Sequence, residues 1–300
     1  MPRHVRFRGG LVLSLALALI LTATMGGPRP HAQHAPLLTY ADYGNQAMTN
    51  LLKDFYTKGK WKGCMSGCAA SNQDWGADAM TFTLFLRWKS HPHDARVESS
   101  LTTLAQTAPH YPSPCQSARG CGQWSDVPMW DSLALGREYE VTGRKQASIL
   151  LKEEAAFNMV DRAGSSVYAF GACPAIHYQQ PGGRRNQLKT LETDSNYIKA
   201  ALLLYRSTQK GSYLSKARAE YAAVRRYFLD PHLPLYSVYV FDDGRTCRQV
   251  HGRFFASVNG NMIDNGLLLA RATGDLSYRD QAIVTAQAVA SFLAKAREMR

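Results

Sequence analysis

One stretch decides the fold: Tyr197-Ile-Lys-Ala-Ala-Leu-Leu-Leu-Tyr-Arg-Ser-Thr208-Gln-Lys-Gly211-Ser-Tyr213. Its apolar residues recur at helical spacing, and a turn with threonine and glycine separates them from a second helical pattern. Glycine just past a helix end can supply the left-handed backbone that lets the chain reverse. The stretch therefore predicts two antiparallel helices joined by a short turn.

Two further segments follow the same pattern, one beginning at Trp130 and the other at Met262. The turn threonine of the first lies 66 residues before Thr208, and that of the last lies 65 residues after it. Such even spacing indicates a repeated helical hairpin. An earlier and less regular copy covers residues 78–88 and 96–105.

The repeat predicts about nine helices and an all-α fold, an α/α toroid that is complete or partial. The expected inner helices are 75–88, 127–142, 190–207 and 258–273, with outer partners at 94–107, 144–160, 212–228 and 277–296. A further helix is expected over 41–55. The long loops should gather at one end of the array, where residues 236–250 alternate around Asp-Gly and predict a β-hairpin.

The amino terminus has the pattern of a secretory signal peptide. A basic start precedes an apolar run from Leu11 to Met25, which is short for a membrane span. We expect residues 1–35 to be a leader and 36–300 the mature domain, either secreted or in the periplasm or cell envelope. A retained anchor is the alternative. No second long apolar run follows, so no membrane span is expected after leader removal.

The formal net charge of +12 raises the question of nucleic-acid binding. Four of the 35 Lys and Arg residues lie in the leader or its tail, which leaves 31 against 23 Asp and Glu. They are spread along the chain without a binding motif, so nucleic acid is not an expected partner. Neither a cofactor nor a metal is expected. His177 and His232 lack partners at metal-ligand spacing, and Asp242-Asp243-Gly244 is typical of a turn and lacks the later ligands of a calcium loop.

Six cysteines in an exported chain indicate disulfides. Two pairs are close in sequence within Gly- and Ser-rich segments, which leaves the last two for each other. The expected bridges are Cys64–Cys68, Cys115–Cys121 and Cys173–Cys247, one of 15 possible pairings. A zinc site is the alternative, but no second His or Cys pair matches the Cys-x3-Cys spacing.

The candidate site is Trp124-Ser-Asp126-Val-Pro-Met-Trp130-Asp131, immediately before a repeat helix. Indoles offer flat apolar faces to pyranose rings, and carboxylates bind hydroxyls or deliver protons. The pattern therefore favours sugar binding. A purely structural interpretation makes Asp126 a helix cap before Pro128 and Trp130 a core residue.

From about Asp74 to the C terminus, the layout resembles glycoside hydrolase family 76, the α-1,6-mannanases with an (α/α)6 toroid. That family carries an Asp-Asp pair before tryptophans that open an inner helix, and Ser125-Asp126-Val-Pro-Met-Trp130 is similar to it. Further segments resemble the ends and beginnings of the family's inner helices: Glu138–Gly143, Lys189–Asp194, and Asn259–Ile263 together with Ala272–Asp275. The resemblance implies an exported glycoside hydrolase acting on α-mannan or a related polysaccharide or oligosaccharide. A non-catalytic glycan-binding relative or an inactive fragment is the alternative.

Two departures from the family matter. Ser125 stands where the family has its first Asp, so the resemblance implies Asp126 as acid/base and leaves the second carboxylate open, with Asp131 the next catalytic candidate. The expected substrate-binding residues are Trp124, Trp130, Asp74, Asp78, Glu192 and Asp194, and the acidic ones are further candidates for the missing carboxylate. The second departure is length, because six hairpins need twelve helices. The sequence is therefore expected to be truncated or to form an incomplete ring.

Overall fold

The computed structural model describes residues 39–71, 75–92, 94–107, 124–142, 147–161, 171–179 and 187–298. The chain divides into two compact units, residues 1–44 and 45–300. In the first unit, the described residues begin helix α1 (Tyr40–Asn50). Thr39 Oγ1 accepts a hydrogen bond from the Asp42 backbone N–H, and the Asp42 carboxylate accepts one from that of Thr39. This reciprocal pair satisfies donors that a helix start leaves free. The predicted leader lies outside the described residues.

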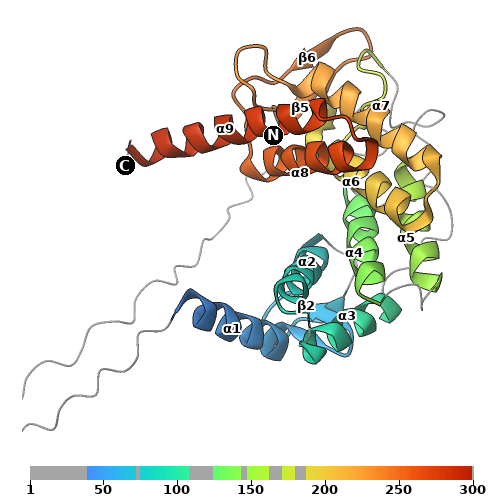
Figure 1. Cartoon of the computed structure of the whole chain (residues 1–300), viewed down its shortest axis with the longest axis vertical. Coiled ribbons are helices and arrows are strands. Elements are labelled where there is room, and N and C mark those ends of the chain that lie inside the picture. The colour runs from blue at the N-terminus through green and yellow to red at the C-terminus, as the bar shows by residue number, and fades with distance from the viewer. Residues whose placement is uncertain are drawn as a thin grey trace, which may run out of the picture. The chain divides into compact units, whose positions relative to one another are not determined.

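The second unit contains four helical hairpins in the part of the chain that is described (Figure 1). The helices are α2 (Trp75–Ser90), α3 (Ala95–Thr107), α4 (Val127–Thr142), α5 (Ala147–Asp161), α6 (Leu191–Thr208), α7 (Gly211–Phe228), α8 (Ala256–Thr273) and α9 (Ser277–Glu298). Each even-numbered helix packs against the odd-numbered helix that follows it. The even-numbered helices also contact one another in order, so they form an inner layer. The predicted all-α hairpin array and its helices are confirmed.

Helix α1 continues into a short π-helix (Leu51–Phe55) and a small sheet that the sequence analysis did not predict. Its antiparallel strands lie in the order β1 (Tyr56–Thr57), β2 (Lys60–Lys62), β3 (Ala70–Ser71). The sheet is attached to α2 through Trp61, which is 2% exposed and donates its indole N–H to Thr81 Oγ1 at 3.0 Å.

A second antiparallel sheet stands at the amino end of α6. Its order is β4 (Leu188–Thr190), β5 (Tyr239–Asp242), β6 (Cys247–Gln249), and β5 and β6 form the hairpin predicted within residues 236–250. Strand β4 runs directly into α6. The sheet therefore fixes where the inner helix begins, which matters for the site described below.

The turn between α6 and α7 differs from the expected one. The left-handed residue is Gln209 (φ 58°), whose N–H donates to Tyr205 O at 2.7 Å, while Gly211 is already the first residue of α7. The turn after α8 follows the expectation, since Gly274 (φ 77°) donates its N–H to Ala270 O. The reversal needs one left-handed residue, and at Gln209 the Cβ makes this conformation cost about 1–2 kcal/mol, a cost that Gly274 avoids.

The core is centred on α6. This helix is buried on most of its faces because α4 and α8 flank it in the inner layer while α5 and α7 cover it from outside. Ile198 and Leu204 are both fully buried. Truncating such a side chain to alanine costs about 2–5 kcal/mol of folding free energy. The other inner helices in the described region are buried over a smaller part of their length.

Two of the predicted disulfides are present, Cys64–Cys68 and Cys173–Cys247. The third predicted pair, Cys115–Cys121, lies outside the described residues. The second bridge joins the segment 171–179 to strand β6, so it fastens two loops at the amino ends of the inner helices.

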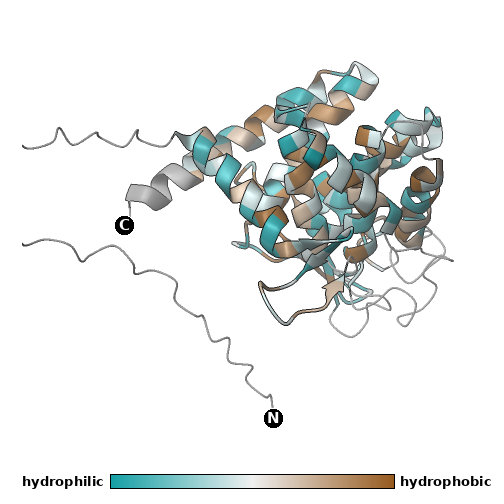
Figure 2. Ribbon diagram, turned by 90° about the horizontal axis from the view of Figure 1, so that it is seen from below, coloured by the Kyte–Doolittle hydropathy of each residue, from teal (hydrophilic) through white to brown (hydrophobic). Residues whose placement is uncertain are grey.

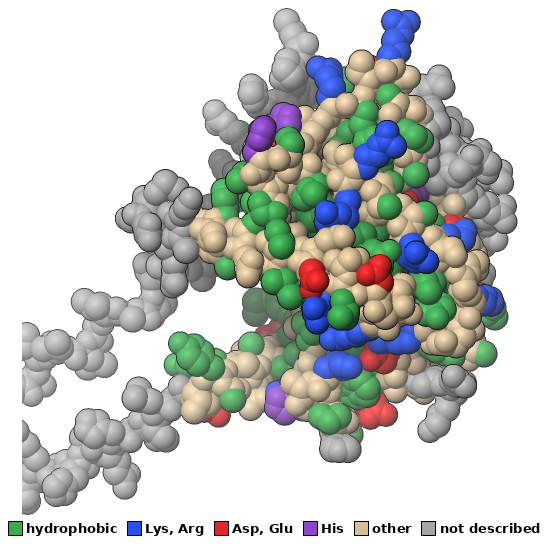
Figure 3. All heavy atoms as spheres, turned by 45° about the horizontal axis from the view of Figure 1, so that its top comes forward, with side chains coloured by type: hydrophobic (Ala, Val, Ile, Leu, Met, Phe, Trp, Pro, Cys, Tyr) green, Lys and Arg blue, Asp and Glu red, His purple; other side chains and the backbone are tan. Residues whose placement is uncertain are grey.

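Apolar and polar residues alternate along the helices (Figure 2). Among the described helices, none is both long and apolar enough to cross a membrane. On the face drawn in Figure 3, Lys and Arg side chains are spread among apolar and polar ones, with acidic side chains between them. This dispersal agrees with the spread of charge along the sequence.

Helices α4 and α5 approach closely around a buried carboxyl. An added Cβ at Gly136 would lie 2.7 Å from Glu153 Oε1, so the Glu153 carboxyl would have to move to admit a side chain at this position of α4. Glu153 is fully buried, and neither carboxyl oxygen has a hydrogen-bond partner among the described residues. Burial raises the pKa of Glu153 well above its usual range, so the neutral acid is the favoured form.

Glu153→Gln is predicted to stabilise the protein, and more so as the pH rises. A buried acid with a raised pKa binds more protons folded than unfolded, so the wild type loses stability above about pH 4.5, the unfolded value. Glutamine removes this loss without changing side-chain size. Thermal unfolding should show a gain of roughly 2 °C or more at pH 8 and a smaller gain at pH 5. The exposed control Glu98→Gln should show no such pH trend, and a gain that is equal at both pH values would contradict the argument.

Candidate active site

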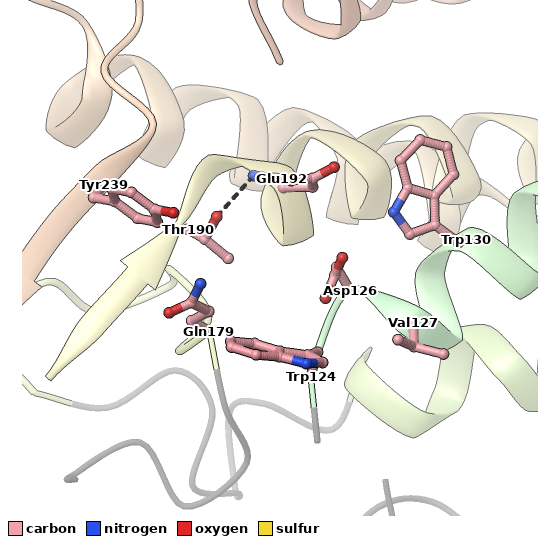
Figure 4. Close-up of a pocket in the computed structure, with 8 residues that line it drawn as sticks. All are labelled: Trp124, Asp126, Val127, Trp130, Gln179, Thr190, Glu192 and Tyr239. Atoms are coloured by element: carbon pink, nitrogen blue, oxygen red, sulfur yellow. Dashed lines mark hydrogen bonds between the residues drawn. The ribbon is translucent and has the colours of Figure 1, made fainter. Parts of the chain in front are cut away.

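One pocket opens at the amino ends of α4 and α6. Its volume is about 320 Å³, and Figure 4 shows the side chains around it. The lining residues are Trp124, Asp126, Val127, Trp130, Gln179, Thr190, Glu192 and Tyr239. This first pocket combines two indoles with two carboxyl groups, which are the groups that sugar recognition and acid/base chemistry use.

Asp126 lies in the turn that leads into α4. Its carbonyl accepts the Trp130 backbone N–H at 2.9 Å, which joins the turn to the helix. Burial raises the pKa of Asp126, although hydrogen bonds from its own backbone N–H and from the Trp130 side chain act in the opposite direction. A carboxyl with a raised pKa keeps its proton closer to neutral pH, as a proton donor must.

Glu192 lies in the first turn of α6, on the other side of the pocket. Its backbone N–H donates to Thr190 Oγ1 at 3.3 Å, so the residue that caps the helix also lines the pocket (Figure 4). Burial raises the pKa of Glu192, and the charge of Asp126 raises it further. The two carboxyl groups therefore influence each other, and in Figure 4 both reach toward the same space beside Trp130.

The remaining polar wall comes from residues that the sequence analysis did not single out. Gln179 ends the segment 171–179, and its carbonyl accepts the backbone N–H of Ser125 at 3.0 Å, next to Asp126. Tyr239 begins strand β5 in the predicted hairpin. The only sequence signal for both was their place in long, aromatic-rich loops, since neither belongs to a recognisable motif.

Half of the predicted site residues meet in the first pocket: Trp124, Asp126, Trp130 and Glu192. Asp131, Asp78 and Asp194 are 2%, 5% and 0% exposed and are not part of its lining. Asp74 lies outside the described residues. Asp131 instead lies near Glu138 on α4, and its charge adds to the burial that raises the pKa of Glu138.

Asp194 belongs to a buried charge cluster behind the pocket. Its Oδ1 lies 2.6 Å from His177 Nδ1 and also accepts the His177 backbone N–H at 3.0 Å. Glu220 Oε1 on α7 lies 3.3 Å from the same ring nitrogen. Burial disfavours the imidazolium, but Glu220 and Asp194 outweigh it and raise the pKa of His177 to about 10. The cluster joins the segment 171–179 to α6 and α7.

These three residues are also the one group in the described regions whose possible ligand atoms lie within 4.8 Å of one another. The separation of 2.6 Å between His177 Nδ1 and Asp194 Oδ1 is a hydrogen-bond distance, so a proton fits between these atoms. His177 is 1% exposed, so it is a core residue with two carboxyl partners, although the sequence showed no partner spacing for it. The sequence could not reveal this, since its partners lie 17 and 43 residues away along the chain.

The layered hairpins, with a carboxyl-lined pocket at the amino ends of the inner helices, define an α/α toroid fold of the kind seen in glycoside hydrolases. In particular, the structure resembles an inactive variant of the α-1,6-mannanase GH76A of Salegentibacter sp. HEL1_6 in complex with α-1,6-mannotriose. The TM-score is 0.65 at 17% identity, covering 84% of this chain and 70% of that one. The family 76 mannosidase Bt3792 from Bacteroides thetaiotaomicron VPI-5482 gives 0.65 at 16% identity, covering 82% and 70%.

A more distant neighbour is an unsaturated glucuronyl hydrolase from Bacillus sp. GL1, responsible for the degradation of glycosaminoglycan. Its TM-score is 0.57 at 14% identity, covering 84% of this chain and 65% of that one. No protein-family model matches the sequence, and a comparison with curated proteins finds no match. At these identities the likeness establishes the fold.

His177→Gln is predicted to destabilise the protein by about 3–5 kcal/mol at pH 6, because it removes the cation between two buried carboxyl groups. The pKa of His177 is raised on folding, so its contribution is complete below about pH 6.5 and is lost as the pH rises toward 10. Chemical unfolding at pH 6 and pH 9.5 should therefore show a smaller difference between variant and wild type at the higher pH. His251→Gln is the control, since His251 is 68% exposed beside Asp230. A difference independent of pH would contradict a charged His177.

Proposed function

We propose that the protein is a glycoside hydrolase that cleaves a polysaccharide or oligosaccharide in the first pocket. The observation that carries this proposal is the pairing of Asp126 and Glu192, which come from different inner helices and line one pocket between Trp124 and Trp130. Glycosidic cleavage needs two carboxyl groups in different protonation states on either side of the scissile bond. The proposed roles are Asp126 as acid/base and Glu192 as the second carboxylate.

The electrostatics of the pair suit these roles. The raised pKa values of Asp126 and Glu192 and the effect of Asp126 on Glu192 make simultaneous ionisation of both groups unfavourable. One group then holds a proton for the leaving oxygen while the other carries the negative charge that stabilises an oxocarbenium-like transition state. The indole faces of Trp124 and Trp130 would hold the sugar ring between them.

The choice of Glu192 follows from the position of Ser125. The sequence resemblance aligns Ser125-Asp126 with the aspartate pair of the family 76 mannanases, and the Salegentibacter enzyme is inactive when two adjacent aspartates are replaced. Ser125 is fully buried and cannot supply a second carboxylate. Glu192 faces Asp126 in the same pocket and would take over this role.

The proposed substrate is α-mannan or a related glycan, since neighbours with this fold include enzymes named as α-1,6-mannanases, one of them in complex with α-1,6-mannotriose. The proposed location is outside the cytoplasm, in the medium, the periplasm or the cell envelope. The predicted leader and the two disulfides support it.

The second candidate function is glycan binding without catalysis, and the loss of an aspartate at Ser125 favours it. The two functions differ in what happens to a bound oligosaccharide. Incubation of the mature protein with mannans and other polysaccharides should release shorter oligosaccharides if the protein is a hydrolase. Binding without release would support the glycan-binding function instead.

Asp126→Asn and Glu192→Gln are each predicted to lower turnover by about 100-fold or more on a glycan that the wild type cleaves, because acid/base catalysis contributes at least that factor. Folding should survive both changes, since asparagine caps a helix about as well as aspartate. Reducing-end release and thermal unfolding measure the two effects. Asp131→Asn is the comparison, because Asp131 is buried outside the pocket. An active Asp126→Asn variant beside an inactive Asp131→Asn variant would transfer the catalytic role to Asp131.

A further inference from the structure

A second pocket adjoins the first and shares Trp130 with it. Its volume is about 380 Å³, and it is formed by all four inner helices. Besides Trp130, its lining includes Phe82, Phe85, Arg137, Lys199, Asn261 and Asp264. A glycan chain bound in the first pocket therefore has room for a neighbouring sugar on the far side of Trp130.

One wall of the second pocket is aromatic. Phe82 packs edge-on against Trp130 with ring centroids 6.0 Å apart, and Phe85 lies beside them in the lining. Flat apolar surfaces of this kind suit the faces of pyranose rings. The aromatic wall therefore points to a sugar residue as the occupant.

Two cations, Arg137 and Lys199, also line the second pocket. Lys199 donates to Asn261 Oδ1 at 2.8 Å and lies 3.0 Å from Asp264 Oδ2. The charge of Arg137 is close enough to disfavour the protonated form of Lys199. Burial lowers the pKa of both cations. Two partly desolvated cations that are close enough to repel each other in one pocket lining favour an anionic occupant.

The carboxylate that pairs with Arg137 belongs to Glu140, which also pairs with two other cations. Glu140 accepts hydrogen bonds from Lys89 at 3.2 Å, from Arg137 at 3.3 Å and from Arg206 at 2.5 Å. Three cations on one carboxylate leave positive charge in excess at this end of the pocket. Lys89 and Arg206 are about half exposed in the last turns of α2 and α6, where cations favour the helix end.

Arg137 differs from these exposed cations at the helix ends, because its side chain is 14% exposed and lies in the pocket wall. Its guanidinium stacks on the Phe85 ring at 4.8 Å. Among the described residues its Nε has no hydrogen-bond partner, although a guanidinium carries five donors. A planar guanidinium that lines a pocket and is fixed beside an aromatic ring matches the shape and charge of a carboxylate.

We propose that the second pocket binds a uronic-acid residue of the glycan, its ring against Phe82 and Trp130 and its carboxylate toward Arg137 and Lys199. This inference rests on the proposed function and narrows its substrate class to an acidic or partly acidic polysaccharide. Asp264 and Asn261 hold the Lys199 ammonium in place, and the Arg137 guanidinium lies in the same pocket lining.

The test is a binding measurement by isothermal titration on the Asp126→Asn variant, which should not consume its ligand. The probes are a trisaccharide of mannuronic acid and mannotriose, which match in ring number and differ in charge. We expect the acidic trisaccharide to bind about tenfold tighter or more, the factor that one charge-assisted hydrogen bond supplies. Adding Arg137→Gln should remove this preference, because it should weaken binding of the acidic trisaccharide about tenfold more than binding of mannotriose.

Arg206→Gln is the matched control, since it removes the same charge from a half-exposed position outside the pocket lining. It should keep the preference within about twofold. If Arg137→Gln does not fold, Asn261→Asp serves instead, because it keeps the side-chain shape and adds a negative charge beside Lys199. That variant should also lose the preference for the acidic sugar.

Equal affinities for the two trisaccharides, or an Arg137→Gln variant that weakens both alike, would overturn the inference. The outcomes also separate it from the proposed function. Arg137-dependent binding of the acidic sugar without hydrolysis by the wild type would support the pocket and contradict the enzyme. Hydrolysis of neutral glycans without a binding preference for acidic ones would support the proposed enzyme and contradict the proposed uronic-acid pocket.

Discussion

The site depends on a buried cation. The imidazolium of His177 lies between Asp194 on α6 and Glu220 on α7, and its backbone N–H donates to the same Asp194 oxygen. A buried carboxylate without this partner would be costly, so the segment 171–179 is fixed to the start of α6. Because Gln179 ends that segment and accepts the Ser125 N–H, the position of Asp126 follows from the same cluster.

A second buried pair fixes the other end of the segment. Lys189 is fully buried, 3.1 Å from Asp242, and donates to Cys173 O at 2.6 Å. The Asp242 carboxylate accepts backbone N–H groups of Ala172 and Cys173, and the disulfide joins Cys173 to strand β6. The segment 171–179 is thus held at both ends, which fixes the turn that carries Asp126, while Glu192 is held by its place in the first turn of α6.

The two pockets on the inner helices carry different charged groups. The first carries the carboxyl groups at the amino ends of α4 and α6, and the second carries cations deeper along the same helices. Trp130 belongs to both, so a ring stacked on it would touch neighbours of either charge. This change from negative charge in the first pocket to positive charge in the second would orient an acidic glycan. The glycan's carboxylate would be repelled from Asp126 and Glu192 and attracted to Arg137.

The sequence by itself determined the helices, because their apolar periodicity and turn residues are local signals. It also predicted the pairing of Cys173 with Cys247, one of 15 possible pairings, and it predicted that Asp126 would share a pocket with its two neighbouring tryptophans. Only the tertiary structure decided which carboxylate faces Asp126. Glu192 and Asp194 are two residues apart on α6, and helical geometry sends Glu192 into the pocket while burying Asp194 against His177. Partners such as Glu220 and Arg137 come from distant segments, so no local pattern could have assigned them.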